Sequence, residues 1–169
     1  MAAITLEPVS TQSQIDTLCA IAKTVWHETY DDLLPPGQPD YMIEKFQSDH
    51  AVKEQMAREN YRYVLAKLGE AYVGFVGYAP RYQGQEEMYL SKAYILPQGR
   101  GQGVVGALFR LVEEETKKEG LSLVRLTVNK GNAHAKAVYE HYGYRTVEAV
   151  QSDIGGGYVM DDYVMVKEL

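Results

Sequence analysis

The sequence Gln98-Gly-Arg-Gly-Gln-Gly103 lies between a run of β-favouring residues, 88–96, and an apolar helical pattern, 104–118. Pro97 ends the first segment because proline cannot donate to a strand ladder. In the second segment apolar side chains recur every three or four residues, which is typical of one buried helix face. Glycines at this position expose successive backbone N–H groups where a helix begins, and such groups bind anions. The stretch therefore predicts a strand, an anion-binding loop and a helix.

Other classes of loop share this glycine pattern. Glycines can simply permit a tight turn that binds nothing. Gly101-x-Gly103-x-x-Gly106 also matches the dinucleotide-binding fingerprint, but that fold needs an acidic residue about 20 positions further on. The segment 123–128 contains no acidic residue. A nucleoside-triphosphate loop is excluded because no Gly-Lys-Ser/Thr follows.

The sequence Tyr94-Ile-Leu-Pro-x-x-Arg-Gly-x-Gly resembles the signature of the Gcn5-related N-acetyltransferase (GNAT) family. In that family an Arg/Gln-x-x-Gly-x-Gly/Ala loop holds the pyrophosphate of acetyl-CoA, and Arg100 and Gly103 match its first two key positions. Val105 departs from the third position, although Gly106 follows immediately. The resemblance implies that acetyl-CoA is bound by Tyr94, Ile95, Leu96, Arg100, Gly101, Gln102, Gly103, Val104, Val105 and Gly106.

A second motif lies further along the chain. Asn132-Ala-His-Ala-Lys-Ala-Val-Tyr139-Glu-His-Tyr-Gly143-Tyr resembles the family's Asn-x-x-Ala-x-x-x-Tyr-x-x-x-Gly-Phe. Ala135 and Tyr139 lie about one and two helical turns beyond Asn132, so a helix places all three on one face. The resemblance implies that Asn132 and Ala135 contact the cofactor and that Tyr139 protonates the departing thiolate. Alternatively, Tyr139 is a core aromatic residue whose hydroxyl finds another partner.

The whole chain, 1–169, has the length of one α/β domain. Helical stripes indicate helices near 10–34, 41–59 and 132–142, and the second of these is one helix or two short ones. The order β-α-α-β-β-β-α-β-α-β-β predicts a mixed sheet with helices on both faces, and the GNAT family has this order with a mostly antiparallel sheet. Further strands are expected at 4–9, 63–67, 72–78, 121–128, 144–150 and 158–166.

Composition limits the partners. The formal net charge of −6 disfavours nucleic acid, which is bound through clustered Lys and Arg, and suits a cationic partner. No run of about 18 apolar residues is present, so we expect a cytoplasmic protein that does not enter a membrane. Cys19 is the only cysteine, and no His and carboxylate set has metal-ligand spacing, so we predict no metal. A homodimer is left open.

Acetyl transfer to an amine requires a neutral amine, a stabilised oxyanion and a proton for the leaving sulfur. Backbone N–H groups near Tyr94 and Ile95 are the expected oxyanion donors. Glu86 and Glu87 open the central strand and could act as general base through water, with Glu87 as the chosen candidate; alternatively, both are simply solvated. The family's layout implies that Trp26, Tyr30 and Asp162 bind the acceptor. Tyr41, Tyr158, Asp31, Asp32 and Asp161 are further candidates for this pocket.

These observations predict an enzyme that moves an acetyl group from acetyl-CoA to a primary amine by direct attack in a ternary complex. Leu90-Ser-Lys-x-Tyr94 and Asp162-Tyr-x-Met165 resemble the polyamine-acetylating subgroup, which implies a small polycationic acceptor. One alternative is a protein or peptide acetyltransferase. The other is a non-catalytic acyl-CoA-binding regulatory module, which Val105 favours and which Asn132 and Tyr139 disfavour.

Overall fold

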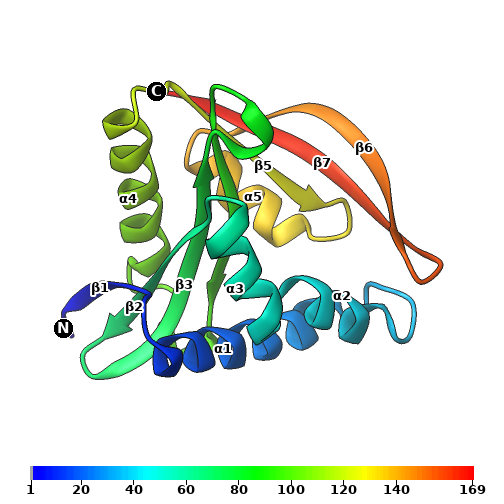
Figure 1. The fold of residues 1–169 in the computed structure, drawn as a ribbon, viewed down its shortest axis with the longest axis horizontal. Coiled ribbons are helices and arrows are strands. Elements are labelled where there is room, and N and C mark those ends of the chain that lie inside the picture. Colours follow the sequence, from blue (N-terminus) through cyan, green and yellow to red (C-terminus); the bar gives the residue numbers. More distant parts are fainter. Residues whose placement is uncertain (1) are drawn as a thin grey trace.

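The computed structural model describes residues 2–169, which form a seven-stranded sheet and five α-helices (Figure 1). The sheet order is β1-β2-β3-β4-β5-β7-β6, and among these strands only β4 and β5 pair in parallel. The strands are β1 Ile4–Pro8, β2 Arg62–Leu68, β3 Ala71–Pro80, β4 Met88–Ile95, β5 Leu123–Asn129, β6 Arg145–Gly155 and β7 Tyr158–Glu168. The helices are α1 Gln12–Tyr30, α2 Gln38–Phe46, α3 Asp49–Arg58, α4 Val104–Lys118 and α5 Ala133–His141. The predicted mixed, mostly antiparallel sheet is confirmed.

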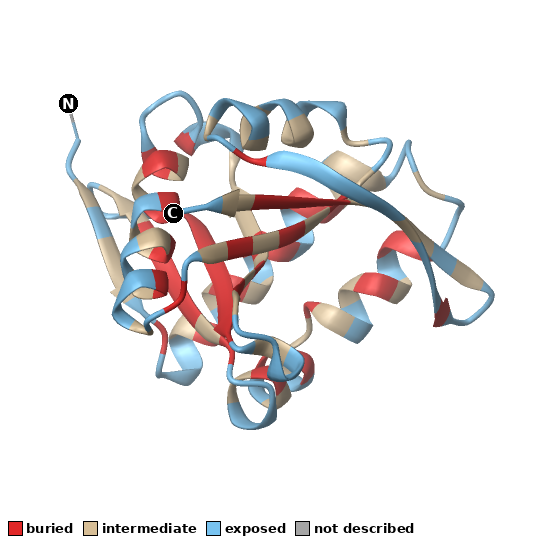
Figure 2. Cartoon of the chain, turned by 90° about the horizontal axis from the view of Figure 1, so that it is seen from above, coloured by how far each residue is buried: buried red, intermediate tan, exposed pale blue. Residues whose placement is uncertain are grey.

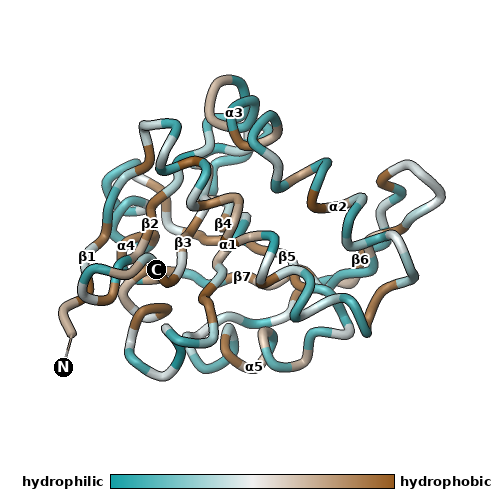
Figure 3. Tube along the Cα trace, turned by 90° about the horizontal axis from the view of Figure 1, so that it is seen from below, coloured by the Kyte–Doolittle hydropathy of each residue, from teal (hydrophilic) through white to brown (hydrophobic). Residues whose placement is uncertain are grey.

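Two hydrophobic clusters cover the two faces of the sheet. Leu108 and Phe109 of α4 pack with β3, β4 and β5 on one face, and α5 adds partly buried residues there. Leu18 of α1 and Val52 of α3 pack with β2 and β3 on the other face. Figure 2 shows the buried residues concentrated on the central strands and on the inner stripes of the helices. Hydrophobic and hydrophilic segments alternate along the helices (Figure 3), as expected for elements that bury one face.

Local capping explains where several helices begin and end. Thr11 and Gln14 form a capping box at the start of α1, so the capping residues expected before this helix are present. The 41–59 stretch is two helices, and the Ser48 side chain caps the second by accepting from the Ala51 N–H. α1 ends at Tyr30, earlier than the sequence suggested, because the N–H groups of residues 33 and 34 both donate to the Tyr30 carbonyl.

The last two strands are longer than expected and form a hairpin that reaches α2 (Figure 1). β6 continues to Gly155 because residues 151–155 keep pairing with β7 beyond the predicted end at 150. At the hairpin tip, the Ile154 carbonyl accepts from the Tyr41 hydroxyl and from Lys45. Ile154 packs with Trp26 and Met42, so this contact joins β6 to α1 and α2.

The centre of the sheet opens between β4 and β5. These strands pair at only two positions, Met88 with Val124 and Tyr89 with Arg125, and then separate. β4 also contains a bulge, because Leu90 pairs with Tyr78 while Lys92 pairs with Gly77, so β4 has one residue more than β3 there. Bulges change the alternation of side chains between the two faces. Within residues 2–169, no helix has the length and apolar character needed to cross a membrane.

Candidate active site

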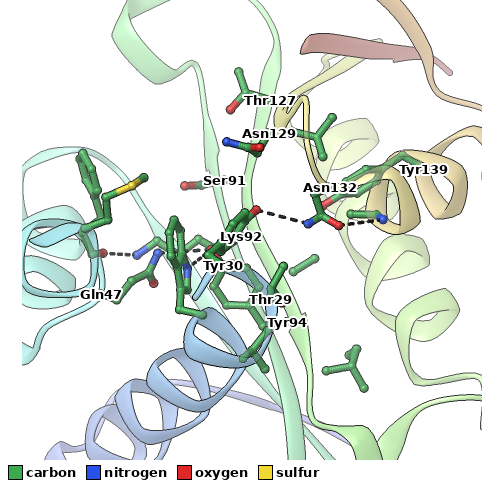
Figure 4. Close-up of a pocket in the computed structure, with 18 of the residues that line it drawn as sticks. Thr29, Tyr30, Gln47, Ser91, Lys92, Tyr94, Thr127, Asn129, Asn132 and Tyr139 are labelled. Atoms are coloured by element: carbon green, nitrogen blue, oxygen red, sulfur yellow. Dashed lines mark hydrogen bonds between the residues drawn. The ribbon is translucent and has the colours of Figure 1, made fainter. Parts of the chain in front are cut away.

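A cavity of about 1130 Å³ lies where β4 and β5 separate (Figure 4). Its walls come from α1, α2, α3, β4, the loop before α4, the start of α4, the end of β5, α5 and β7. In Figure 4, Tyr30, Lys92 and Tyr94 lie on one side of the cavity, and Asn132 and Tyr139 lie across from them. The cavity therefore joins the two motifs that the sequence analysis singled out.

Most of the predicted site residues line this cavity. They are Trp26, Tyr30, Tyr94, Ile95, Arg100, Gly101, Gly103, Val104, Val105, Asn132, Ala135, Tyr139 and Asp162. Three predicted cofactor contacts lie beside it instead. Leu96 packs in the core on the α1 face, and Gln102 is exposed with its amide donating to the Gln98 carbonyl. Gly106 is buried where a Cβ would meet the Tyr142 hydroxyl at 3.0 Å.

Glu87 does not line this cavity. Its carboxylate accepts from Arg125 Nε at 2.7 Å and from Nη2 at 3.3 Å. It lines a separate cavity of about 260 Å³. Arg125 reaches Glu87 because β5 places it directly opposite Tyr89. The structure therefore does not bring the predicted general base to Tyr139.

The loop before α4 presents free backbone donors to the cavity. Gly103 is the N-cap of α4 with φ +82°, a conformation that favours glycine. Within residues 2–169, none of the amide N–H groups of residues 101–106 has a hydrogen-bond acceptor. Arg100 adds a positive charge and is held by Glu28 at 2.6 Å and by the Ile95 carbonyl at 3.2 Å. Free amides, a helix N-terminus and a guanidinium fit a pyrophosphate group.

The edge of β4 supplies a second set of donors. The Leu96 N–H donates to the Val73 carbonyl of β3 at 2.8 Å. Because N–H groups alternate between the two edges of a strand, those of Ala93 and Ile95 point to the opposite edge, from which β5 has separated. These N–H groups can pair with an extended ligand or with a developing oxyanion.

Tyr139 lies on α5 beside Phe109, and both line the cavity. Its ring stacks on Phe109 with centroids 5.6 Å apart. Burial raises the pKa of Tyr139, and the neighbouring Tyr30 and Tyr89 raise it further, so the hydroxyl is protonated at neutral pH. Within residues 2–169 this hydroxyl forms no hydrogen bond, which leaves its proton available to a ligand.

Asn132 connects α5 to α1. Its side-chain oxygen caps α5 by accepting from the Ala135 N–H at 3.2 Å. Its amide nitrogen donates to the Tyr30 hydroxyl at 3.3 Å. Asn132 therefore fixes the start of the helix that carries Tyr139 and ties it to the opposite wall of the cavity.

An aromatic wall closes the other end of the cavity. Trp26 Nε1 donates to the Tyr94 hydroxyl at 2.8 Å, and Gln47 Nε2 donates to the same oxygen at 3.3 Å. Trp26 and Tyr30 pack with ring centroids 4.3 Å apart. Gln47 is 3% exposed, and its oxygen has no partner within residues 2–169. This end can hold an apolar chain and accept a hydrogen bond.

Lys92 lines the cavity although the sequence analysis gave it no role. It is 5% exposed, and its ammonium donates to the Phe46 carbonyl and to Gln55 Oε1. Burial lowers its pKa to about 7. The sequence did contain a signal for Lys92, which lies between Leu90 and Tyr94 in a central strand. A charged residue in such a strand is buried in the protein interior and needs polar partners there.

The carboxylates of the cavity differ in part from those expected. Asp162 lines it, whereas Asp31, Asp32 and Asp161 do not. Burial and the charge of Asp161 raise the pKa of Asp162 to about 6, and Lys130 opposes this shift. Tyr41 and Tyr158 pack against each other with centroids 5.1 Å apart and do not line the cavity. Three further glutamates, which the sequence analysis did not assign, line it from α2, α3 and the residue after α3: Glu44, Glu54 and Glu59.

The acetyltransferase (GNAT) domain family matches residues 28–160 of this chain. The chain belongs to the GNAT family. An uncharacterized N-acetyltransferase of Mycobacterium bovis is 35% identical over 95 residues, which cover 56% of this GNAT chain and 60% of that protein. The match thus spans less than two thirds of the relative's length.

Solved structures share this GNAT fold. The PaiA N-acetyltransferase of Thermoplasma acidophilum, in complex with coenzyme A, aligns with a TM-score of 0.79 and 19% identity, over 99% of both chains. Naa50 of Arabidopsis thaliana, in complex with the bisubstrate analogue CoA-Ac-MVNAL, aligns with a TM-score of 0.67 and 19% identity, over 98% of this chain and 99% of that one. At these identities the comparison shows the fold alone.

Proposed function

We propose that this protein, as a single domain, transfers the acetyl group of acetyl-CoA to a primary amine by direct attack in a ternary complex. One observation carries the proposal. Within residues 2–169, a single cavity joins amide N–H groups without an acceptor, those of Gly101, Gly103, Val104 and Val105, to the Tyr139 hydroxyl, which forms no hydrogen bond. It does so across the point where β4 and β5 separate. Anion binding at one end and an acid at the other are what this reaction needs.

The cofactor end holds acetyl-CoA mainly through backbone groups. The amides of residues 101–106 and the Arg100 guanidinium bind the pyrophosphate, and the N–H groups of Ala93 and Ile95 bind the extended arm. The cofactor supplies an acetyl group activated as a thioester. The same strand edge donates to the carbonyl oxygen as negative charge develops there. Tyr139 then protonates the departing sulfur, since its hydroxyl lines the cavity, is protonated at neutral pH and donates to no acceptor within residues 2–169.

The acceptor is a small polycationic amine of the polyamine type. Glu44, Glu54 and Glu59 bring negative charge to the cavity from the α2 and α3 side. Glu54 is the only one of these three with an ion pair within residues 2–169, to the exposed Arg58. A cationic acceptor would be attracted by this charge. A peptide amine is the second candidate, because the Arabidopsis structure of the same fold holds the bisubstrate analogue CoA-Ac-MVNAL.

Release of free thiol from acetyl-CoA tests the proposal. We would compare spermidine, a monoamine of matched length and a short peptide with a free N-terminus. Spermidine is expected to be the best acceptor by kcat/KM. A peptide that outperforms both amines would replace the polyamine class with the peptide class. A protein that binds coenzyme A but releases no thiol with any amine would be the acyl-CoA-binding module instead.

A further inference from the structure

Asp162 is a buried carboxylate without a partner. It is 5% exposed and lines the cavity, and within residues 2–169 its side chain forms no hydrogen bond or ion pair. The adjacent Asp161 differs, because its side chain is 45% exposed and pairs with Lys130 at 2.8 Å. Buried carboxylates are normally paired, so the free lone pairs of Asp162 require an explanation.

The position of Asp162 is set by the strands around it. β5 places Asn129 directly opposite on one side, and β6 places Val150 on the other. Asn129 is the last residue of β5 and also lines the cavity. Asp162 therefore lies at the end of β5 that has separated from β4, on the same side of the opening as Tyr139.

Two tyrosines connect Asp162 with Tyr139. Burial is the main cause of the raised pKa of Tyr30 and of Tyr89, and the negative charge of Asp162 raises both further. The same two tyrosines raise the pKa of Tyr139. The strands and helix that carry the two groups are also joined directly. Asn129, which pairs with Asp162, accepts from the Asn132 N–H at 2.9 Å, and Asn132 caps the helix that carries Tyr139. Asp162 and Tyr139 both line the cavity.

We propose that Asp162 is a catalytic residue that removes the proton from the attacking ammonium, an inference that rests on the proposed function. A primary amine has a pKa near 10, like lysine, so it arrives protonated and cannot attack. Glu87 cannot serve because Arg125 holds it outside the cavity. Asp162 lines the cavity, and within residues 2–169 its carboxylate forms no ion pair.

Acetyl transfer moves two protons from the ammonium nitrogen. Asp162 takes one ammonium proton, and the nitrogen lone pair forms the bond to the acetyl carbon while the C=O π pair moves to oxygen. The C=O bond then re-forms and the C–S bond breaks. Tyr139 gives its proton to the sulfur and regains one from the nitrogen. The products are the amide, the free thiol and one proton, which Asp162 releases to solvent.

The charges around Asp162 suit this role. Asp161 on β7 disfavours the ionised form and Lys130 after β5 favours it. Tyr30 of α1 and Tyr89 of β4 are uncharged at neutral pH because their pKa values are raised. The other charged or ionisable side chains that line the cavity, apart from tyrosines, are Glu28, Glu44, Lys45, His50, Glu54, Glu59, Lys92, Arg100 and His134. With a pKa of about 6, Asp162 is ionised at pH 7 to 8 and can accept a proton.

The test is the pH profile of kcat for wild type, Asp162→Asn and Asp162→Glu, measured with spermidine and with the matched monoamine. Asp162→Asn should lower kcat by about 100-fold or more for both amines, the range typical of a lost general base. The fall in wild-type rate below about pH 6 should disappear in this variant, whose residual rate should rise steadily with pH. Asp162→Glu should restore part of kcat.

Asp161→Asn is the matched control: at about pH 8 its kcat should stay within about threefold of wild type because the lost ion pair with Lys130 is partly exposed. Its fall in rate at low pH should move to lower pH, because the charge of Asp161 raises the pKa of Asp162. Unchanged affinity for coenzyme A by calorimetry should accompany each variant. An Asp162→Asn variant that keeps kcat, or that raises KM for spermidine alone, would make Asp162 an ammonium anchor and overturn the inference. A wild type that acetylates no amine would overturn the proposed function itself, so the two failures differ.

Discussion

The two ends of the cavity are built from different parts of the protein. The cofactor end uses backbone groups from one contiguous stretch, the edge of β4 and residues 101–106. The acceptor end uses side chains from distant elements, among them Trp26 of α1, Gln47 after α2 and Asp162 of β7. Most side-chain substitutions leave a backbone N–H donor in place, whereas each substitution in a wall of side chains changes the shape or charge of that wall. The proposed function therefore assigns cofactor binding to local sequence, and acceptor choice to the packing of the helices and the final hairpin.

The largest expected effect is at the cofactor end. Gly103→Val should lower affinity for coenzyme A by about 10³-fold, because two or more charge-assisted hydrogen bonds of about 1.5–3 kcal/mol each are lost. A Cβ at Gly103 would meet only Ile4 Cδ1 at 3.9 Å, so the internal space is not the obstacle. Calorimetric titration of coenzyme A measures the change.

Gly120→Val is the matched control for Gly103→Val. Gly120 has φ +74° and open space around its Cα, but it lies at the far end of α4. Both variants carry similar backbone strain, so only Gly103→Val should lose affinity. Equal losses of affinity for coenzyme A in the two variants would mean that the effect comes from folding. The assignment of pyrophosphate binding to this loop would then be wrong.

The next effect is on chemistry between the two ends. Tyr139→Phe should lower kcat by about 100-fold while affinity for acetyl-CoA stays nearly intact, because the hydroxyl acts on the departing sulfur. Tyr144→Phe is the control, since Tyr144 packs against Tyr139 at 5.7 Å but does not line the cavity. Wild-type turnover by Tyr139→Phe across the pH range would assign the acid role to another group.

A smaller effect is expected at the acceptor end, where Lys92 makes the free energy of unfolding depend on pH. The pKa of Lys92 is lowered to about 7, so between pH 7 and 10 the unfolded chain binds more protons than the folded one and stability rises with pH. From pH 7 to pH 9 the gain from this group is about 2 kcal/mol. Urea unfolding measures the free energy of unfolding at each pH, and Lys92→Met should lack this rise. The control Lys53→Met, which removes an exposed ion pair, should retain it. A rise of equal size in Lys92→Met would contradict the account of Lys92.

The smallest effect concerns acceptor charge. If the carboxylates of the cavity attract the acceptor, the advantage of spermidine over the matched monoamine should shrink several-fold as salt rises from about 0.01 M to 0.15 M. The measurement is kcat/KM for both amines at the two ionic strengths. Equal rates for the two amines at low salt would remove the polyamine class and leave the acetyltransferase proposal standing.

The sequence predicted the cofactor end better than the acceptor end. The strand, glycine loop and helix at 88–118 are consecutive, so periodicity and turn chemistry predicted these elements and an anion-binding loop. The family resemblance added Arg100 and Gly103, and both line the cavity. Glu87 was chosen only because it precedes the central strand. Its pairing with Arg125 depends on the register of β4 with β5, which a single sequence does not specify.

The acceptor end depends on tertiary contacts that leave little trace in the sequence. The bulge in β4 brings Lys92 to the α2 and α3 side, although strict alternation would have placed it differently. Asp31 and Asp32 are exposed, and the cavity acids come instead from α2 and α3. Asp161 and Asp162 are adjacent and chemically identical, and only the pleat of β7 separates the exposed one from the buried one.

The most direct test of the cofactor end follows the backbone amides by two-dimensional ¹⁵N–¹H NMR as ligand is added. Coenzyme A should shift the resonances of residues 101–106, whose N–H groups have no acceptor within residues 2–169. Pantetheine, which lacks the pyrophosphate, should shift Ala93 and Ile95 but leave residues 101–106 near their free positions. If pantetheine and coenzyme A move residues 101–106 equally, or if neither moves them, the pyrophosphate does not bind at the start of α4.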